Sequence, residues 1–181
     1  MRKILFFQWN AFMQKGIERA FTYLGMEYDT FYYIFKDWDK DDDFKEKFKK
    51  RLQSGKEEYE YVFSVNFSPL ISEVCNDLQV KYVSWIYDCP LHIRNKEPMK
   101  YSCNTIFFFD RIEAENYRNK GVNAYHLPLA GDTVAFTEKY KYVDMNMMHN
   151  EEKGIYTGFT ETDMCDVSLV GKLYHSDYAY L

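Results

Sequence analysis

The side chains best suited to chemistry in this sequence come just after its apolar, aromatic runs. They are Gln8, Trp9 and Asn10; Asn66, Phe67 and Ser68; Asp88, Cys89 and Pro90; Asp110 and Arg111; and Pro128 with Asp132. In a parallel α/β sheet, ligands bind beyond the carboxyl ends of the strands, so a site is expected at such positions. The set is polar, aromatic and acidic, which suits a sugar or another polyol. The alternative is that these side chains only cap helices, because strand ends are polar in every such fold.

Asp88 is the candidate for catalysis. It follows the run Trp85-Ile-Tyr, and a carboxylate at the carboxyl end of an apolar strand could accept a proton from a hydroxyl nucleophile. The alternative is a turn residue that holds the backbone before Pro90. For Asp110 the alternative is stronger, because Asp110 and Glu113 have the spacing of a capping box. The residues expected to bind substrate beside Asp88 are Trp9, Asn10, Asn66, Asp110 and Arg111.

Metal sites, nucleophilic triads and phosphate loops are not expected from the sequence. The acidic run 37–43 fails as an EF-hand loop, because Asp42 stands at the glycine position and Phe48 at the final glutamate position. As a D-x-D motif the run does not differ from a solvated loop beside a helix N-terminus. The four histidines show no ligand spacing and no Ser or Cys motif. Neither G-x-G-x-x-G nor a P-loop occurs, and the bulk of Trp9-Asn-Ala-Phe12 disfavours a nucleotide at the first turn.

Strands and helices must alternate to position these residues. Short aromatic or β-branched runs predict strands at 3–9, 28–35, 59–65, 81–87, 105–109 and 124–127. Apolar stripes at helical spacing predict three helices between them, with the stripes Ile17, Ala20, Phe21 and Leu24; Phe44, Phe48 and Leu52; and Leu70, Ile71, Val74, Cys75 and Leu78. This alternation predicts an α/β fold, a Rossmann-like three-layer sandwich with a mostly parallel central sheet.

The residues at the helix ends agree with this alternation. Gly25 and Gly121 stand where a helix C-terminus needs a residue that tolerates positive φ. Ser68-Pro69 supplies an N-cap followed by a first-turn proline. Asp43 and Glu46, like Asp110 and Glu113, have the spacing of a capping box. We therefore expect helices to begin at these three places.

The composition excludes several classes of protein. The chain has 181 residues, of which 46% are hydrophobic and 19% aromatic, so we expect one well-buried main domain. The net charge is -5 and the basic residues are scattered among acidic ones, so nucleic acid is not expected as a partner. The apolar run 4–7 is too short for a signal peptide, and no later run could span a bilayer. The four cysteines contain no C-x-x-C pair, and we expect them to be reduced in the cytoplasm.

The alternation of strands and helices weakens after about Gly131. Residues 140–162 are polar, Met-rich and aperiodic, which is typical of an irregular connector. The run Asp166-Val-Ser-Leu-Val170, followed by Gly171, then has the pattern of a new strand that leads into a turn. We therefore expect a Rossmann-like domain at 1–135, a connector at 136–164 and the start of a truncated second domain at 165–181.

Five short motifs together resemble a known family. They are Lys3-Ile-Leu-Phe-Phe7, Trp85-Ile-Tyr-Asp-Cys-Pro90, Phe107-Phe-Phe-Asp110, Leu127-Pro-Leu-Ala130 and Asp166-Val-Ser-Leu-Val-Gly171. In this order, and over nearly the whole chain, they resemble the N-terminal domain of CgeB-like, spore-maturation proteins related to glycosyltransferases. That domain is itself catalogued as one of unknown function.

The resemblance implies a GT-B architecture, in which two Rossmann-like domains face each other across a cleft. The N-terminal domain holds the acceptor, which is a sugar, a glycan or a protein, and the C-terminal domain holds the nucleotide-sugar donor. Gly171 would open the first loop of the donor domain and thus contact the donor. Almost all of that domain is missing here, so this part of the chain is expected to bind no cofactor and to be inactive alone. Enzymes of this kind generally work without a bound metal.

Two features depart from the family pattern. Cys89 stands where a small residue such as serine is expected, and no donor-site acidic motif is present. Cys89 by itself puts no role in doubt, and the missing acidic motif is the more serious departure. The main alternative, from another class of function, is a non-catalytic binding or assembly module that kept the fold and lost the chemistry. A flavodoxin-like or receiver-like domain is a weaker alternative, because the first turn lacks a phosphate-binding loop. Exposed aromatic residues near the end of the chain could also pair two copies as a homodimer.

Overall fold

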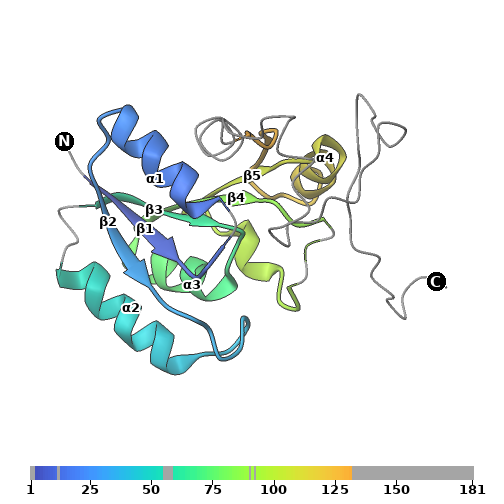
Figure 1. Cartoon of the computed structure of the whole chain (residues 1–181). Helices are drawn as coiled ribbons and strands as arrows, with labels where there is room; N and C mark the ends of the chain where they lie inside the picture. The colour runs from blue at the N-terminus through green and yellow to red at the C-terminus, as the bar shows by residue number, and fades with distance from the viewer. Residues whose placement is uncertain (1–2, 12, 55–58, 90, 92, 132–181) are drawn as a thin grey trace, which may run out of the picture. The chain divides into compact units, whose positions relative to one another are not determined.

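The computed structural model describes residues 3–11, 13–54, 59–89, 91 and 93–131, in which strands and helices alternate (Figure 1). The elements are β1 (Lys3–Gln8), α1 (Gln14–Tyr23), β2 (Tyr28–Tyr32), α2 (Asp42–Ser54), β3 (Tyr59–Val65), α3 (Pro69–Leu78), β4 (Lys81–Ile86), the 3₁₀ helix η1 (Glu97–Lys100), β5 (Asn104–Phe108), α4 (Arg111–Arg118) and β6 (Ala124–His126). The strands form one sheet in the order β2-β1-β3-β4-β5-β6, and every neighbouring pair is parallel. The prediction of a Rossmann-like α/β fold is confirmed.

The strand order changes direction between β1 and β3. From β1 the chain first moves one way to β2, and from β3 it continues the other way through β4 and β5 to β6. Such a reversal is the topological switch point of a doubly wound sheet, where adjacent loops diverge and ligands bind beyond the carboxyl ends of the strands. The loops after β1 and β3 are therefore the first place to look for a site.

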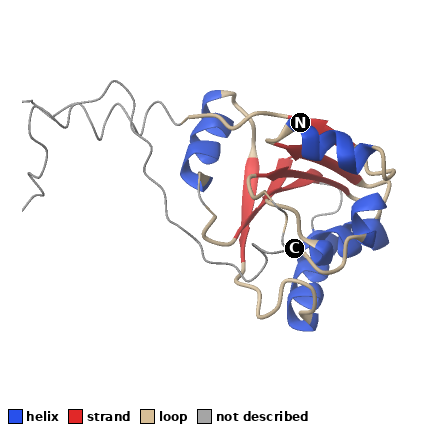
Figure 2. Ribbon diagram, turned by 90° about the vertical axis from the view of Figure 1, so that its right-hand side faces the viewer, coloured by secondary structure: helices blue, strands red, loops and turns tan. Residues whose placement is uncertain are grey.

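Helices cover both faces of the sheet (Figure 2). The larger core cluster joins one face of the strands to α2, α3 and α4, and its fully buried members include Phe44, Leu70 and Ala114. The smaller cluster lies on the other face under α1 and has Phe6, Ile17 and Val65 as its buried members. The alternation of faces along β1 explains this division, because Leu5 and Phe7 belong to the large cluster.

Aromatic rings fill the large core between β1, β2 and α2. Phe44 and Phe48 are fully buried, and their rings stack at 5.1 Å between centroids. Phe7 meets Phe44 edge-on at 5.7 Å, and Phe31 meets Phe48 edge-on at 5.2 Å. Offset and edge-on contacts of this kind add to the free energy that burial of the rings already supplies. This packing fixes α2 against the sheet.

A buried tyrosine ties β3, β4 and α3 together. The hydroxyl of Tyr82 lies 2.7 Å from Ser64 Oγ and accepts a hydrogen bond from the backbone N–H of Ser68 at 3.0 Å. The Ser64 hydroxyl in turn donates to the backbone oxygen of Asn66 at 2.6 Å. All three side chains of Ser64, Ser68 and Tyr82 are buried. This network fixes the turn that follows β3, which is one side of the switch point.

The helix ends match the sequence with one correction. Gly25 and Gly121 have φ of 65° and 84° and follow α1 and α4, as predicted. Ser68 and Asp110 cap α3 and α4 as predicted. The prediction that Asp43 caps α2 is wrong, because Asp41 accepts the N–H of Phe44 at 3.0 Å. Asp41 is buried, whereas Asp43 lies inside the first turn and pairs with Lys47.

Several predicted boundaries also need correction. β2 ends three residues before the predicted position 35, because its last ladder bond runs from Tyr33 N–H to the Gln8 oxygen and Phe35 then turns into the core. The other strands differ by at most one residue at either end. η1 was not predicted. The predicted connector at 136–164, the second domain at 165–181 and Gly171 lie outside the described residues. In the part of the chain that is described, no helix is long and apolar enough to cross a membrane.

Candidate functional site

The candidate residues gather at the carboxyl ends of adjacent strands. Trp9 and Asn10 follow β1, Asn66 follows β3 and Asp88 follows β4 by two residues. These three strands are neighbours in the sheet, and the first two flank the switch point. Asp110 follows β5, which lies next to β4. The fold therefore places all of them along one edge of the sheet, as expected for parallel strands.

Asn66 is the structural centre of this edge. Its backbone is left-handed, with φ of 58°, and only 9% of the residue is exposed. Its side-chain amide donates to Asp88 Oδ2 at 2.7 Å, and its amide oxygen accepts from the backbone N–H of Tyr87 at 2.8 Å. Its own N–H donates to the Trp85 oxygen at 2.8 Å. Asn66 thus holds the chain after β4 and aims the Asp88 carboxylate, which is exposed.

Asn66 was expected to bind substrate, and in the structure both ends of its side-chain amide are hydrogen-bonded within the protein. Each end keeps one further hydrogen-bonding position, because an amide has two N–H donors and two oxygen lone pairs, so substrate binding by Asn66 stays a prediction. Asn is one of the few residues other than glycine that adopt the left-handed conformation readily. A charge-assisted bond to a carboxylate is among the stronger hydrogen bonds in proteins. The pair Asn66–Asp88 is therefore a preorganised polar unit.

Trp9 and Asn10 form the β1 side of the edge. The Trp9 indole N–H donates to the backbone oxygen of Val65 at 3.0 Å, which joins the ends of β1 and β3. Its ring meets Trp38 edge-on, with 4.6 Å between centroids and 85° between planes. Asn10 is exposed, has φ of 68° and accepts from the hydroxyl of Tyr32 at 3.3 Å. Trp9 is thus partly buried against the large core cluster, whereas the amide of Asn10 is exposed at the end of β1.

Asp110 and Arg111 form the β5 side. Asp110 Oδ1 accepts the N–H of Glu113 at 2.7 Å, so the capping role predicted from its spacing is confirmed. Arg111 is the first residue of α4 and is exposed. Burial raises the pKa of the Cys89 thiol, and the negative charges of Glu113 and Asp110 raise it further. The N-cap carboxylate of Asp110 and the first-turn carboxylate of Glu113 therefore act on the loop that carries Asp88.

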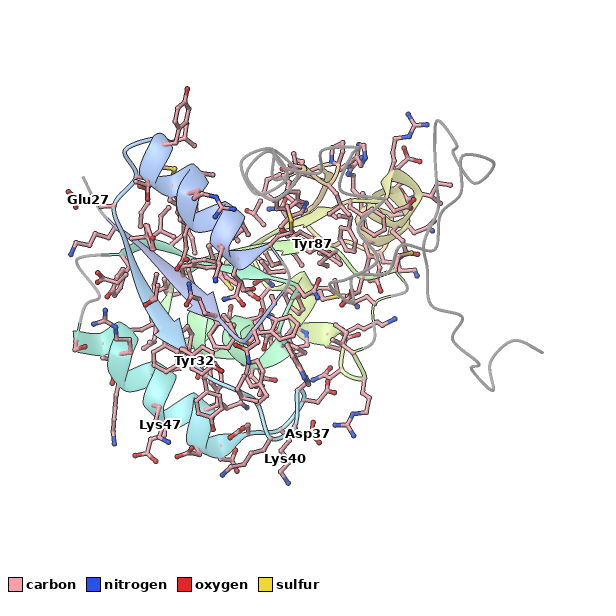
Figure 3. All side chains as sticks on the ribbon, viewed as in Figure 1. Glu27, Tyr32, Asp37, Lys40, Lys47 and Tyr87 are labelled. Carbon is pink, nitrogen blue, oxygen red and sulfur yellow. The ribbon has the colours of Figure 1, made fainter. Side chains whose placement is uncertain are left out.

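The acidic loop between β2 and α2 is organised by partners that the local sequence does not reveal. Arg94 donates to Asp37, labelled in Figure 3, and to Asp39, in the latter case at 2.9 Å from Nε. The hydrogen bond from Arg94 holds the pKa of Asp37 below its usual range. Burial raises the pKa of Asp41, but hydrogen bonds from the N–H groups of Lys36 and Phe44 outweigh it, so the pKa is lowered. The carboxylates of Asp37, Asp39 and Asp41 are therefore all engaged in hydrogen bonds that stabilise this loop.

No family model matches this chain, and no match is found among curated proteins or solved structures. A site at the carboxyl ends of the strands is therefore supported by the geometry at the switch point.

Proposed function

We propose that this chain contains the acceptor-side domain of a GT-B type glycosyltransferase, which moves a sugar from a nucleotide-sugar donor to a hydroxyl group of an acceptor. One observation carries the proposal, namely that Asn66 holds the Asp88 carboxylate at the carboxyl ends of the strands, beside the switch point. The motifs that resemble CgeB-like proteins support it independently. The donor would be held by a second domain.

In this proposal Asp88 is the general base. As the acceptor oxygen attacks the anomeric carbon, its hydroxyl proton passes to the Asp88 carboxylate. The bond between the anomeric carbon and the diphosphate oxygen breaks at the same time, and its electron pair leaves with the nucleoside diphosphate. Asn66 fixes the direction of the carboxylate by its bond to Oδ2. Trp9, Asn10 and Arg111 would surround the acceptor, and Asp110 would hold the start of α4 beside it. Positioning of this type supplies a large part of the rate enhancement in transferases.

The test is Asp88→Asn in the natural full-length protein. We expect turnover to fall by about 10²- to 10⁴-fold, because an amide does not accept the proton, while nucleotide-sugar binding stays unchanged. The matched control is Asp77→Asn, the same chemical change at an exposed position near the C-terminal end of α3. Unchanged turnover in Asp88→Asn would remove Asp88 from the reaction.

One observation favours the alternative of a non-catalytic binding module. One oxygen of Asp88 is already engaged by Asn66, as it would be in a purely structural turn. In that case the carboxyl edge binds a saccharide, and the full-length protein shows no transfer. Measurements of acceptor binding and of turnover on the same sample separate the two functions. The strand order is also that of flavodoxin-like domains, but the bulky first turn after β1 argues against a bound phosphate there.

A further inference from the structure

β2 is one border of the sheet, and among the described residues no strand pairs with its outer side (Figure 1). The ladder with β1 shows which backbone groups of β2 point outward. Before β2 the oxygen of Glu27 accepts from the Ile4 N–H at 2.9 Å, and after it the N–H of Tyr33 donates to β1. Alternate residues of a strand point their N–H and C=O groups to opposite sides, so the odd-numbered residues bond to β1. The outward groups belong to Tyr28, Thr30 and Tyr32.

The outer side of β2 lacks the features that usually protect an edge strand. Natural edge strands are very short, or carry Lys, Pro or a β-bulge, because an open edge pairs readily with another strand. β6, the opposite border, has three residues, whereas β2 has five and contains no Lys, Pro or Gly. β2 also pairs with β1 in continuous register. It is therefore an edge that a further strand can extend.

Large hydrophobic side chains are exposed at both ends of this edge. Tyr23 and Leu24, at the C-terminal end of α1, come shortly before β2 and are 90% and 65% exposed. Tyr32 ends β2 and Ile34 follows it, and they are 57% and 51% exposed. A two-fold axis perpendicular to the sheet at the middle of β2 places the carboxyl end of one copy beside the amino end of the other. Each exposed pair then meets the other pair, twice in one dimer.

The charged groups at the amino end of β2 include both signs. Asp29, the one charged residue of β2, accepts from Tyr59 at 2.7 Å and from Arg51 at 3.0 Å, and it lies 3.7 Å from Lys3. Glu27, labelled in Figure 3, precedes β2 and is exposed. The two acidic groups are thus matched by two basic ones, and this end carries no excess of one sign.

The carboxyl end of β2 is balanced in the same way. The hydroxyl of Tyr33 donates to Asp41 and Asp43, which are the acidic groups here. The hydrogen bond from Lys47 lowers the pKa of Asp43, and the charge of Lys36 contributes to the same shift. Lys36 is exposed. An antiparallel second copy therefore meets no like-charge excess at either end, and its Lys36 approaches Glu27 of the first copy.

From the open edge, the exposed hydrophobic pairs and the balanced charges we infer that two copies of this chain pair through antiparallel β2 strands and share one continuous sheet. Thr30 lies at the two-fold axis, where its N–H and C=O bond to those of Thr30 in the second copy. Tyr28 then lies opposite Tyr32 of the second copy, on the same face of the sheet. Aromatic cross-strand pairs of this kind stabilise sheets. The inference does not depend on the proposed function.

Sedimentation velocity of the whole chain over a range of concentrations tests the inference. We expect the wild-type chain to sediment as a dimer that dissociates on dilution. Thr30→Pro removes an outward N–H, and proline is tolerated where the N–H of an edge strand faces solvent, so the ladder with β1 is kept. This variant should raise the dimer dissociation constant at least about tenfold. The matched control Thr30→Val keeps the N–H and a β-branched side chain and should change the constant less than about threefold.

A second variant and an exchange measurement locate the interface. Thr30→Lys changes an exposed side chain and leaves the backbone free, but it places two lysines opposite each other at the axis, so it should also weaken the dimer at least about tenfold. Far-ultraviolet circular dichroism checks that each variant is folded. In the wild-type chain, the outward amide protons of Thr30 and Tyr32 should be protected from exchange at high concentration and lose this protection on dilution.

Three results would overturn the inference. The first is a wild-type chain that stays monomeric at every concentration. The second is a dimer that folded Thr30→Pro and Thr30→Lys leave unchanged, because another surface would then hold the two copies together. The third is protection of the Thr30 and Tyr32 amide protons that does not change on dilution, because the outer side of β2 would then be paired within one chain.

Discussion

Reversing the polarity of the Asn66–Asp88 pair tests the central contact of the site. Asn66→Asp keeps the oxygen that accepts the Tyr87 N–H and keeps a residue that tolerates left-handed backbone. It removes only the donor that Asp88 accepts at 2.7 Å and replaces it with a second carboxylate. The double variant Asn66→Asp with Asp88→Asn restores one donor and one carboxylate with their places exchanged.

The expected change in the free energy of unfolding for Asn66→Asp is the sum of two contributions. A hydrogen bond to a charged group contributes about 1.5–3 kcal/mol, and the exposure of Asp88 places this pair at the lower end. Two carboxylates about 4 Å apart in a water-like medium repel by about 1 kcal/mol. We therefore expect Asn66→Asp to lower the free energy of unfolding by about 2–3 kcal/mol at neutral pH. The double variant should recover most of this loss, as a double-mutant cycle requires for groups in direct contact.

Urea-induced unfolding, followed by far-ultraviolet circular dichroism, measures these free energies. Asp88→Asn alone completes the cycle and should cost less than Asn66→Asp, because a neutral amide still accepts from Asn66. A coupling energy below about 0.5 kcal/mol would refute the reasoning, since distant and independent sites add to within that range. The Asn66 amide would then not hold Asp88 in solution, and the proposed site would lose its basis.

Other consequences of the fold can be measured by the same unfolding experiment. Tyr82→Phe should cost about 1–3 kcal/mol, because the buried N–H of Ser68 loses its acceptor, and a loss near zero would contradict the network. Asp41→Ala should cost about 1–2 kcal/mol through loss of the N-cap, while Asp42→Ala, at an exposed neighbour, should cost clearly less. Because the pKa of Asp41 is lowered in the folded state, its contribution is present above about pH 4 and is lost as the pH falls; Asp41→Asn should therefore flatten the acid side of the stability profile. Phe44→Ala should cost about 3–5 kcal/mol, and a smaller loss would mean that the core collapses around the gap.

The sequence predicted most of the fold because the fold depends on local patterns. Each of the six described strands and the helices α1 to α3 has its own apolar run or stripe. The stripe of α2 buries Phe44, Phe48 and Leu52 as its spacing predicts, and that of α3 does so except at Leu78. The prediction for α1 is only partly right, because Ile17 is buried whereas Ala20 and Leu24 are exposed. The caps at Ser68 and Asp110 were predictable because donor and acceptor are three residues apart. Parallel pairing follows wherever a helix connects successive strands, whereas β4 and β5 are joined by a long connection that contains only η1.

The predictions that failed concern contacts between residues far apart in the sequence, or positions where several neighbouring residues could form the same contact. Three aspartates stand at the start of α2, and only packing selects Asp41, the buried one, as its N-cap. The partner of Asp37 is Arg94, which is 57 residues away. The placement of the candidate residues along the carboxyl edge of the sheet was predictable, because the ends of parallel strands lie side by side. The hydrogen bond from Asn66 to Asp88 was not, since it depends on the left-handed backbone of Asn66 and joins residues 22 positions apart.

The unequal covering of the two sheet faces has a consequence for motion at the switch point. α1 buries a single residue, Ile17, whereas α3 buries six, and the cluster under α1 has three buried members. Helices with few buried apolar contacts open at lower free energy than the rest of a domain, so amide protons of α1 should exchange with solvent before those of α2 and α3. The loop that carries Trp9 and Asn10 leads directly into α1, so each such opening also loosens one side of the candidate site. A ligand that bridges this loop and Asp88 would slow that exchange, which makes the protection of α1 a readout of binding even for a weakly held saccharide.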